Sequence, residues 1–151
     1  MTIRSALWVL VFVFLFETPG IGQTRLRPEI INYPNAVYQA QSQNWSITQD
    51  EHGFIFVGNN EGLLSYNGAQ WQLYPMPKHQ ILRCVAADHK GRIYGGGFGA
   101  FGYWQKEPLS GYVYHSLDRL IRDSMFSEEE IWKIIPTENQ VLFQSFSRIH
   151  L

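Results

Sequence analysis

The feature that most constrains the fold of this chain is a repeat with a period close to 40 residues. The segment Asp50–Tyr66 joins tight-turn residues to two short apolar runs, and its opening Asp-x-x-Gly turn returns at Asp88, 38 residues later. A fainter third copy includes Trp132, which lies 87 residues after Trp45. A period of this length, with several short strands in each copy, is typical of β-propeller blades.

Each complete copy is expected to form a four-stranded antiparallel meander, because β-branched and aromatic runs alternate with turn residues. In the first copy the expected strands are Asn44–Gln49, Phe54–Val57, Leu63–Tyr66 and Gln70–Tyr74, with Asn67-Gly68 as a hairpin turn. In the second copy they are Ile81–Ala87, Arg92–Gly95, Phe101–Trp104 and Tyr112–Ser116. The third copy holds strands near residues 132–136, 141–144 and 147–151.

We therefore predict an all-β chain that forms an incomplete propeller of two full blades and part of a third. The expected boundaries are an N-terminal arm at 23–43, blade 1 at 44–80, blade 2 at 81–130 with an inter-blade insertion at 117–130, and the partial blade 3 at 131–151. Helical spacing and a capping box at residues 127–130 predict at most one helical turn in the insertion. Because propellers usually close with four to eight blades, the chain is expected to be the N-terminal piece of a longer protein.

The first 22 residues are expected to be a secretory signal peptide. Arg4 precedes an uninterrupted apolar run of eleven residues, Ala6–Phe16, and small residues follow up to Gly22. Eleven helical residues span about 16 Å, which is too short for a bilayer core of about 30 Å. The single cysteine, Cys84, cannot form an internal disulfide and is expected to be a buried strand residue. Export without disulfides favours a Gram-negative periplasm.

Charge and motifs give no support for catalysis, a metal, a cofactor or nucleic-acid binding. The net charge is −1, with no basic stripe. Gly97–Gly102 spells GxGxxG, but a strand end and Pro108 follow instead of the helix that a dinucleotide site requires. Asp50 and Asp88 are expected to cap their own turns. The five histidines show no metal-ligand spacing, and the acidic run 128–130 is expected to be a solvated surface.

The candidate ligand-binding residues are Arg83, Trp45 and Trp132. They occupy the same position in the three copies, at the start of each predicted inner strand, where side chains can approach the channel of a propeller. Aromatic faces suit sugars and other amphipathic molecules, although packing between blades is an alternative role for both tryptophans. Arg83 interrupts an apolar run and is therefore the better candidate.

Several longer stretches resemble one family. The repeat at residues 50–68 looks like the two-component-regulator propeller repeat. The more specific stretches resemble the N-terminal sensor region of Bacteroidetes membrane regulators; they are Asn32-Tyr33, Tyr38–Ala40, Gln43–Trp45, Gly58–Leu64, Gly96–Trp104, Ile131–Ile134 and Phe143–Phe146. Members of that family carry a periplasmic propeller, a triple-tyrosine domain, one membrane span and a cytoplasmic output that is either a LuxR-type helix-turn-helix or a histidine kinase.

The resemblance implies a non-catalytic segment of a transmembrane signalling or transcription regulator. Its expected partners are a small-molecule or glycan ligand, the rest of the propeller and the membrane-proximal domain, with no nucleic acid bound by this segment and no membrane span after signal cleavage. The output domain, and with it any kinase activity, maps to no residue here. Two alternatives stay open: an exported scaffold or adhesion module, and a glycan-active propeller enzyme.

Overall fold

The structure is a computed structural model that describes residues 28–121 and 128–151. The chain divides into two compact units, Met1–Ile31 and Asn32–Leu151. In the first unit only residues 28–31 are described, and they form neither helix nor strand. The predicted signal peptide at residues 1–22 lies outside the described residues. No described helix has the length and apolar character needed to cross a membrane.

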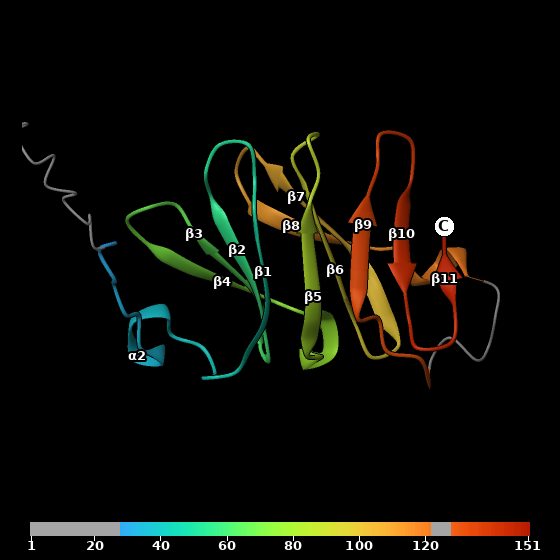
Figure 1. Cartoon of the computed structure of the whole chain (residues 1–151), viewed down its shortest axis with the longest axis horizontal. Coiled ribbons are helices and arrows are strands. Elements are labelled where there is room, and N and C mark those ends of the chain that lie inside the picture. Colours follow the sequence, from blue (N-terminus) through green and yellow to red (C-terminus); the bar gives the residue numbers. More distant parts are fainter. Residues whose placement is uncertain (1–27, 122–127) are drawn as a thin grey trace, which may run out of the picture. The chain divides into compact units, whose positions relative to one another are not determined.

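Three antiparallel sheets follow one another along the second unit (Figure 1), which is all-β as predicted. The first sheet contains β1 (Asn44–Gln49), β2 (Ile55–Asn59), β3 (Gly62–Tyr66) and β4 (Trp71–Pro75) in sequential order. The second sheet contains β5 (Leu82–Ala87), β6 (Arg92–Gly97), β7 (Ala100–Glu107) and β8 (Gly111–Ser116), also in sequential order. The third sheet contains β9 (Lys133–Pro136), β10 (Val141–Gln144) and β11 (Ile149–His150).

The repeated Asp-x-x-Gly turns adopt the same geometry in both complete copies. Oδ1 of Asp50 accepts hydrogen bonds from the backbone N–H groups of His52, at 3.0 Å, and Phe54, at 2.8 Å. Oδ1 of Asp88 accepts the equivalent bonds from Lys90, at 2.8 Å, and Arg92, at 2.9 Å. This confirms the turn-capping role, because short acidic side chains satisfy backbone donors that a tight turn leaves unpaired. It also places the two aspartates in corresponding positions of neighbouring sheets.

The sheets are joined by apolar packing between their faces. Side chains from the first and second sheets share one core, in which Phe56, Leu63, Leu82, Ile93 and Trp104 are almost completely buried. A second core joins the second and third sheets and contains Cys84, Tyr94, Phe101, Ile131, Ile134 and Phe143. Glycines allow the close approach, since a Cβ atom on Gly96 would lie 2.7 Å from Cγ2 of Ile131. Each sheet therefore stabilises its neighbour by covering an apolar face.

The opposite face of the first sheet is covered by the part of the arm that belongs to the second unit. The short helix α2 (Asn35–Tyr38) begins after Pro34, and the buried Tyr38 packs against Trp71 with ring centroids 5.9 Å apart. The Tyr33 hydroxyl lies 2.8 Å from that of Tyr66. The arm therefore seals a sheet face that would otherwise expose aromatic side chains.

One connection differs in detail from the sequence prediction. The loop after β3 contains four residues rather than a tight Asn-Gly pair, because Tyr66 pairs with Trp71 and Oδ1 of Asn67 accepts N–H bonds from Ala69 and Gln70. Within the described part of the insertion, Asp118–Leu120 forms a 3₁₀ turn, η2. The predicted capping box begins at Ser127, which lies outside the described residues.

Candidate functional site

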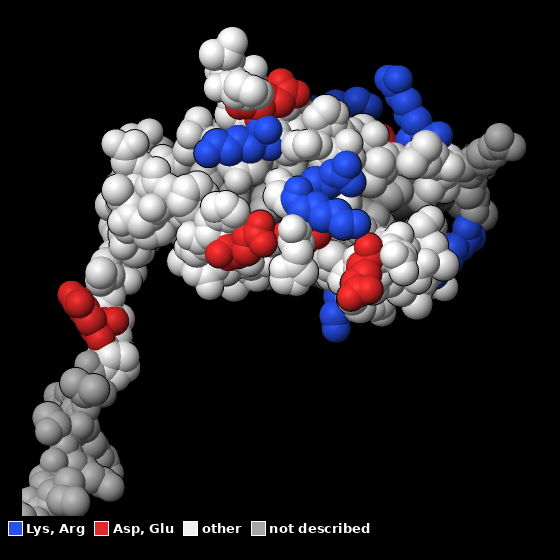
Figure 2. Space-filling model, turned by 90° about the horizontal axis from the view of Figure 1, so that it is seen from above, with Lys and Arg blue, Asp and Glu red and all other residues white. Residues whose placement is uncertain are grey.

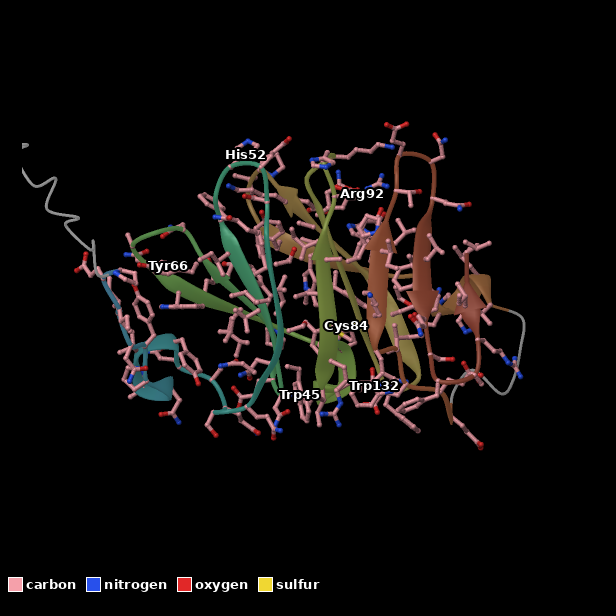
Figure 3. The ribbon with its side chains drawn as sticks, viewed as in Figure 1. Trp45, His52, Tyr66, Cys84, Arg92 and Trp132 are labelled. Carbon is pink, nitrogen blue, oxygen red and sulfur yellow. The ribbon has the colours of Figure 1, made fainter. Side chains whose placement is uncertain are left out.

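The three residues at the equivalent repeat position meet at one end of the sheets. The guanidinium carbon of Arg83 lies 3.8 Å from the ring centroid of Trp45 and 5.6 Å from that of Trp132. Figure 3 shows Trp45 and Trp132 at the same end, with His52 and Arg92 at the opposite one. We call Trp45, Arg83 and Trp132 the indole–guanidinium stack. Contacts of this kind contribute about 0.5–2 kcal/mol each, with the larger values for desolvated pairs.

Two matching β-bulges direct the first two members of the stack. In the first sheet Asn44 pairs with Asn59 and Ser46 with Gly58, which leaves Trp45 as the extra residue. In the second sheet Leu82 pairs with Gly97 and Cys84 with Gly96, which leaves Arg83 as the extra residue. A bulge re-aims the side chain of its additional residue. The repeat therefore places both side chains out of the regular alternation and toward one another.

Hydrogen bonds from the hairpin between β2 and β3 fix the orientation of Trp45. Its indole Nε1 donates to Oδ1 of Asn60 at 2.8 Å, and Nδ2 of Asn60 donates to Oε1 of Gln41 at 3.0 Å. The preceding Asn59 is fully buried and donates to the carbonyl oxygen of Gln43 at 3.0 Å. Asn59 and Asn60 thus anchor the segment that leads into β1.

Glu130 fixes the other side of the stack. Its Oε1 accepts a hydrogen bond from Nε of Arg83 at 2.5 Å, and the two side chains are only 19% and 18% exposed. The backbone positions Glu130 through a bridge to Phe98 and through the bond from the Ile131 N–H to the Gly97 carbonyl oxygen, 3.0 Å long. Among the described residues, Nη1 of Arg83 is buried without an acceptor. Arg83 of the stack therefore forms a largely buried ion pair with Glu130 and keeps one donor, Nη1, without a partner in the described part of the chain.

The expectation that residues 128–130 form a solvated surface is wrong for two of the three glutamates. The side chain of Glu129 is 13% exposed, and its carboxylate accepts a bond from Oγ of Ser147 at 3.0 Å. It forms an ion pair with Arg148 at 3.3 Å and lies 3.3 Å from Nε2 of His150. Its hydrogen bond with Ser145, followed by those with Ser147 and His150 and the charge of Arg148, lowers the pKa of Glu129. Glu128 is exposed, as predicted.

A cleft of about 330 Å³ lies beside the stack. Its lining comprises Phe98, Glu128, Glu129, Glu130, Ser145, Phe146 and Ser147. The Phe146 ring is 86% exposed and lies 5.3 Å from the Trp132 ring, while Trp45 and Trp132 are 38% and 40% exposed. Exposed aromatic faces therefore extend from the stack to the cleft, and such faces bind the apolar faces of ring-shaped ligands.

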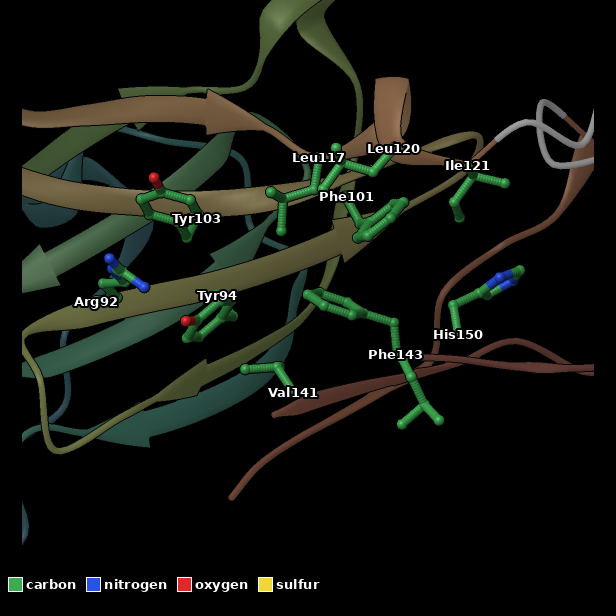
Figure 4. A pocket seen from close by; sticks show the side chains of 11 residues that line it. Arg92, Tyr94, Phe101, Tyr103, Leu117, Leu120, Ile121, Val141, Phe143 and His150 are labelled. Atoms are coloured by element: carbon green, nitrogen blue, oxygen red, sulfur yellow. The ribbon is translucent and has the colours of Figure 1, made fainter. Parts of the chain in front are cut away.

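A second cavity, of about 250 Å³, lies between the second and third sheets (Figure 4). Its walls are mainly aromatic and aliphatic side chains that also belong to the core between these sheets, among them Tyr94, Phe101 and Phe143. Arg92 lines it with its guanidinium carbon 5.0 Å from the Tyr103 ring centroid.

Figure 2 shows basic and acidic side chains interspersed on the end of the molecule opposite the stack, without a patch of one sign.

Two other sequence features have structural roles. The GxGxxG residues form the hairpin between β6 and β7, as predicted. Gly97 lies against the carbonyl oxygen of Ile81, and a Cβ atom at position 97 would be only 2.1 Å from that oxygen. Cys84 is buried, its Sγ lies 3.3 Å from the Ile131 carbonyl oxygen, and burial raises its thiol pKa to about 12. Within residues 28–121 and 128–151, no group of three or more metal-ligating side chains occurs.

Comparisons of the chain with protein-family models and with curated proteins find no match.

The sequence prediction missed two residues that hold the stack, Asn60 and Glu130. Asn60 reads as an ordinary turn residue, and Glu130 belongs to a run of three acidic residues. A possible signal was the apolar environment expected around Arg83, because a buried guanidinium requires a carboxylate partner. The sequence alone does not identify which acidic residue provides it.

Proposed function

We propose that this chain is the N-terminal fragment of an exported, ligand-binding β-propeller that serves as the sensor domain of a transmembrane signalling or transcription regulator. The segment itself is non-catalytic and lies in the periplasm. The observation that carries this proposal is the convergence of Trp45, Arg83 and Trp132 from equivalent positions in the three repeat copies. In this proposal the two four-stranded sheets are complete blades and the three-stranded sheet is part of a further blade.

The geometry supports ligand binding at the stack because it combines a rigid centre with accessible aromatic faces. Arg83 is fixed by Glu130 and lies against two indole rings that remain about 40% exposed. Rigid aromatic side chains provide contact area at a low entropic cost. In a closed ring of such blades, the equivalent positions would surround the channel, so one ligand could touch several blades.

This arrangement also suggests how binding could be transmitted. A ligand that contacts both Trp45 and Trp132 connects the first and third repeat copies. It therefore stabilises the arrangement of the sheets in which both indole rings can contact it. Such differential affinity shifts a two-state equilibrium between the propeller and a membrane-proximal domain. The ligand class is a glycan fragment or another small molecule with an apolar ring face.

Calorimetry with a panel of neutral and acidic sugars tests the binding role. We expect saturable heat with at least one sugar, and at least a tenfold loss of affinity in Trp45→Ala and in Trp132→Ala. Trp71→Phe is the matched control, because Trp71 packs under the arm on the first sheet, and its affinity should stay within twofold. No saturable heat with any sugar, or equal affinity in all variants, would contradict the proposed site, whereas turnover of a sugar would indicate an enzyme.

Export is tested separately with a reporter protein that is active only outside the cytoplasm. Fusion of residues 1–43 to this reporter should give activity in a Gram-negative host, and deletion of residues 6–16 should abolish it. Activity that persists after the deletion would argue against the signal peptide.

A further inference from the structure

The electrostatic balance of the stack constrains the kind of ligand that it can accept. Nε of Arg83 is held by Glu130 at 2.5 Å, so the positive charge is already compensated within the protein. The charge of Glu129 is compensated by Arg148. Glu128 is exposed on the same cleft and adds a further negative charge. A ligand at the stack therefore meets a neutral to negative environment, although an arginine lies at its centre.

This environment opposes anionic ligands. A ligand carboxylate close to Glu130 would be repelled by the like charge, and the repulsion grows as solvent is excluded from the pair. It could not displace Glu130 without leaving that carboxylate unpaired in a site that is only 19% exposed. An uncharged ring has no such cost and can still stack on the indoles of Trp45 and Trp132.

We propose that Glu130 is a specificity-determining residue: it makes the site accept uncharged ring ligands and reject the same rings when they carry a carboxylate. This inference rests on the proposed function and adds to it the ligand charge that the site selects. Rejection by a fixed like charge is a common source of discrimination between similar ligands. Without the Glu130 charge, the positive charge of Arg83 would be uncompensated, and a guanidinium group attracts and binds carboxylates.

The test compares sugars that differ in a single carboxylate, namely galactose with galacturonate and glucose with glucuronate, in the wild-type chain and in Glu130→Gln. Benzamide and benzoate form a third pair, which distinguishes sugar acids from aromatic acids as ligands of the variant. We expect Glu130→Gln to bind at least one of these carboxylates at least tenfold more tightly than the wild type does. Affinity for the uncharged partner should change less than twofold.

Glu107→Gln is the matched control, since it removes the same charge from a half-exposed side chain whose carboxylate lies 3.9 Å from Nε2 of His115. It should leave all affinities unchanged. Glu130→Met, which is neutral and similar in size, replaces Glu130→Gln if the latter does not fold, and the same gain is expected.

The outcomes separate the inference from the function on which it rests. If the uncharged sugars bind and the Glu130 variants gain no affinity for any carboxylate, the inference is wrong while the proposed function stands. If the wild type already binds the carboxylates as tightly as their uncharged partners, the inference is wrong as well. If no compound binds to any variant, both fail together.

Discussion

Leu82→Ala tests whether the sheets depend on one another for stability. Leu82 belongs to β5 of the second sheet, is completely buried, and shares a core with Phe56 and Leu63 of the first sheet. The sheets approach closely here, since a Cβ atom on Gly58 would lie 2.9 Å from the Leu82 carbonyl oxygen. Because the backbones already lie this close, the two sheets cannot move together to fill the cavity that alanine would leave. The substitution should therefore cause nearly the full loss of stability expected for an unfilled cavity.

Leucine-to-alanine changes in rigid cores cost about 2–5 kcal/mol, and we expect about 3 kcal/mol for Leu82. The measurement is urea unfolding followed by tryptophan fluorescence, with an unchanged dependence of free energy on denaturant concentration. Leu109→Ala is the control, because Leu109 is fully exposed, and its free energy of unfolding should change by less than about 0.5 kcal/mol.

A double-mutant cycle with Phe56→Ala then locates the effect at the contact between the sheets. Residues in contact should show a coupling energy of about 0.5–3 kcal/mol. A loss below about 1 kcal/mol for Leu82→Ala, or strict additivity in the cycle, would refute the view that the first two sheets share one core.

Three further predictions concern individual groups. The pKa of the Cys84 thiol is raised to about 12, so at pH 8 its reaction with iodoacetamide should be at least about a hundredfold slower in the folded chain than in urea. Equal rates in the two conditions would show that the thiol is not buried. Asp88→Ala should lower the free energy of unfolding in urea by about 1–2 kcal/mol, because two backbone N–H groups lose their acceptor. Asp88→Asn keeps an acceptor oxygen and should lower it by less than half of that amount. Equal losses in the two variants would contradict the turn-capping role. Glu129 has a lowered pKa in the folded chain, so its contribution to stability is present above the ordinary pKa near 4.5 and is lost as the pH falls through the lower pKa of the folded state. Between about pH 5 and 3, the free energy of unfolding should therefore fall more steeply for the wild type than for Glu129→Gln. Parallel curves of stability against pH would contradict this.

The sequence predicts the repeated architecture because the signals that define it are local. Asp50 and Asp88 cap turns within four residues of themselves, and the apolar runs between turns have the length of strands. Alignment of the copies alone places Trp45 and Arg83 at equivalent positions. These features depend on neighbours along the chain and are therefore visible without a structure.

The geometry of the stack could not be predicted in the same way. The bulges at Trp45 and Arg83 depend on the register with β2 and β6, which single-strand patterns do not specify. The ion pair between Arg83 and Glu130 joins residues 47 positions apart. Their contact depends on a bridge between Phe98 and Glu130 that no periodicity in the sequence indicates.

The most direct test of ligand recognition by the stack uses the indole N–H signals of the ¹⁵N-labelled chain. The sugar that gives the largest heat in the calorimetric panel is titrated, and the signals of Trp45, Trp132 and Trp104 are followed. We predict that the Trp45 and Trp132 signals move together and saturate with the calorimetric Kd, while Trp104, which is 1% exposed in the core, does not move. Saturable binding that leaves both stack signals unchanged would contradict the assignment of the ligand site.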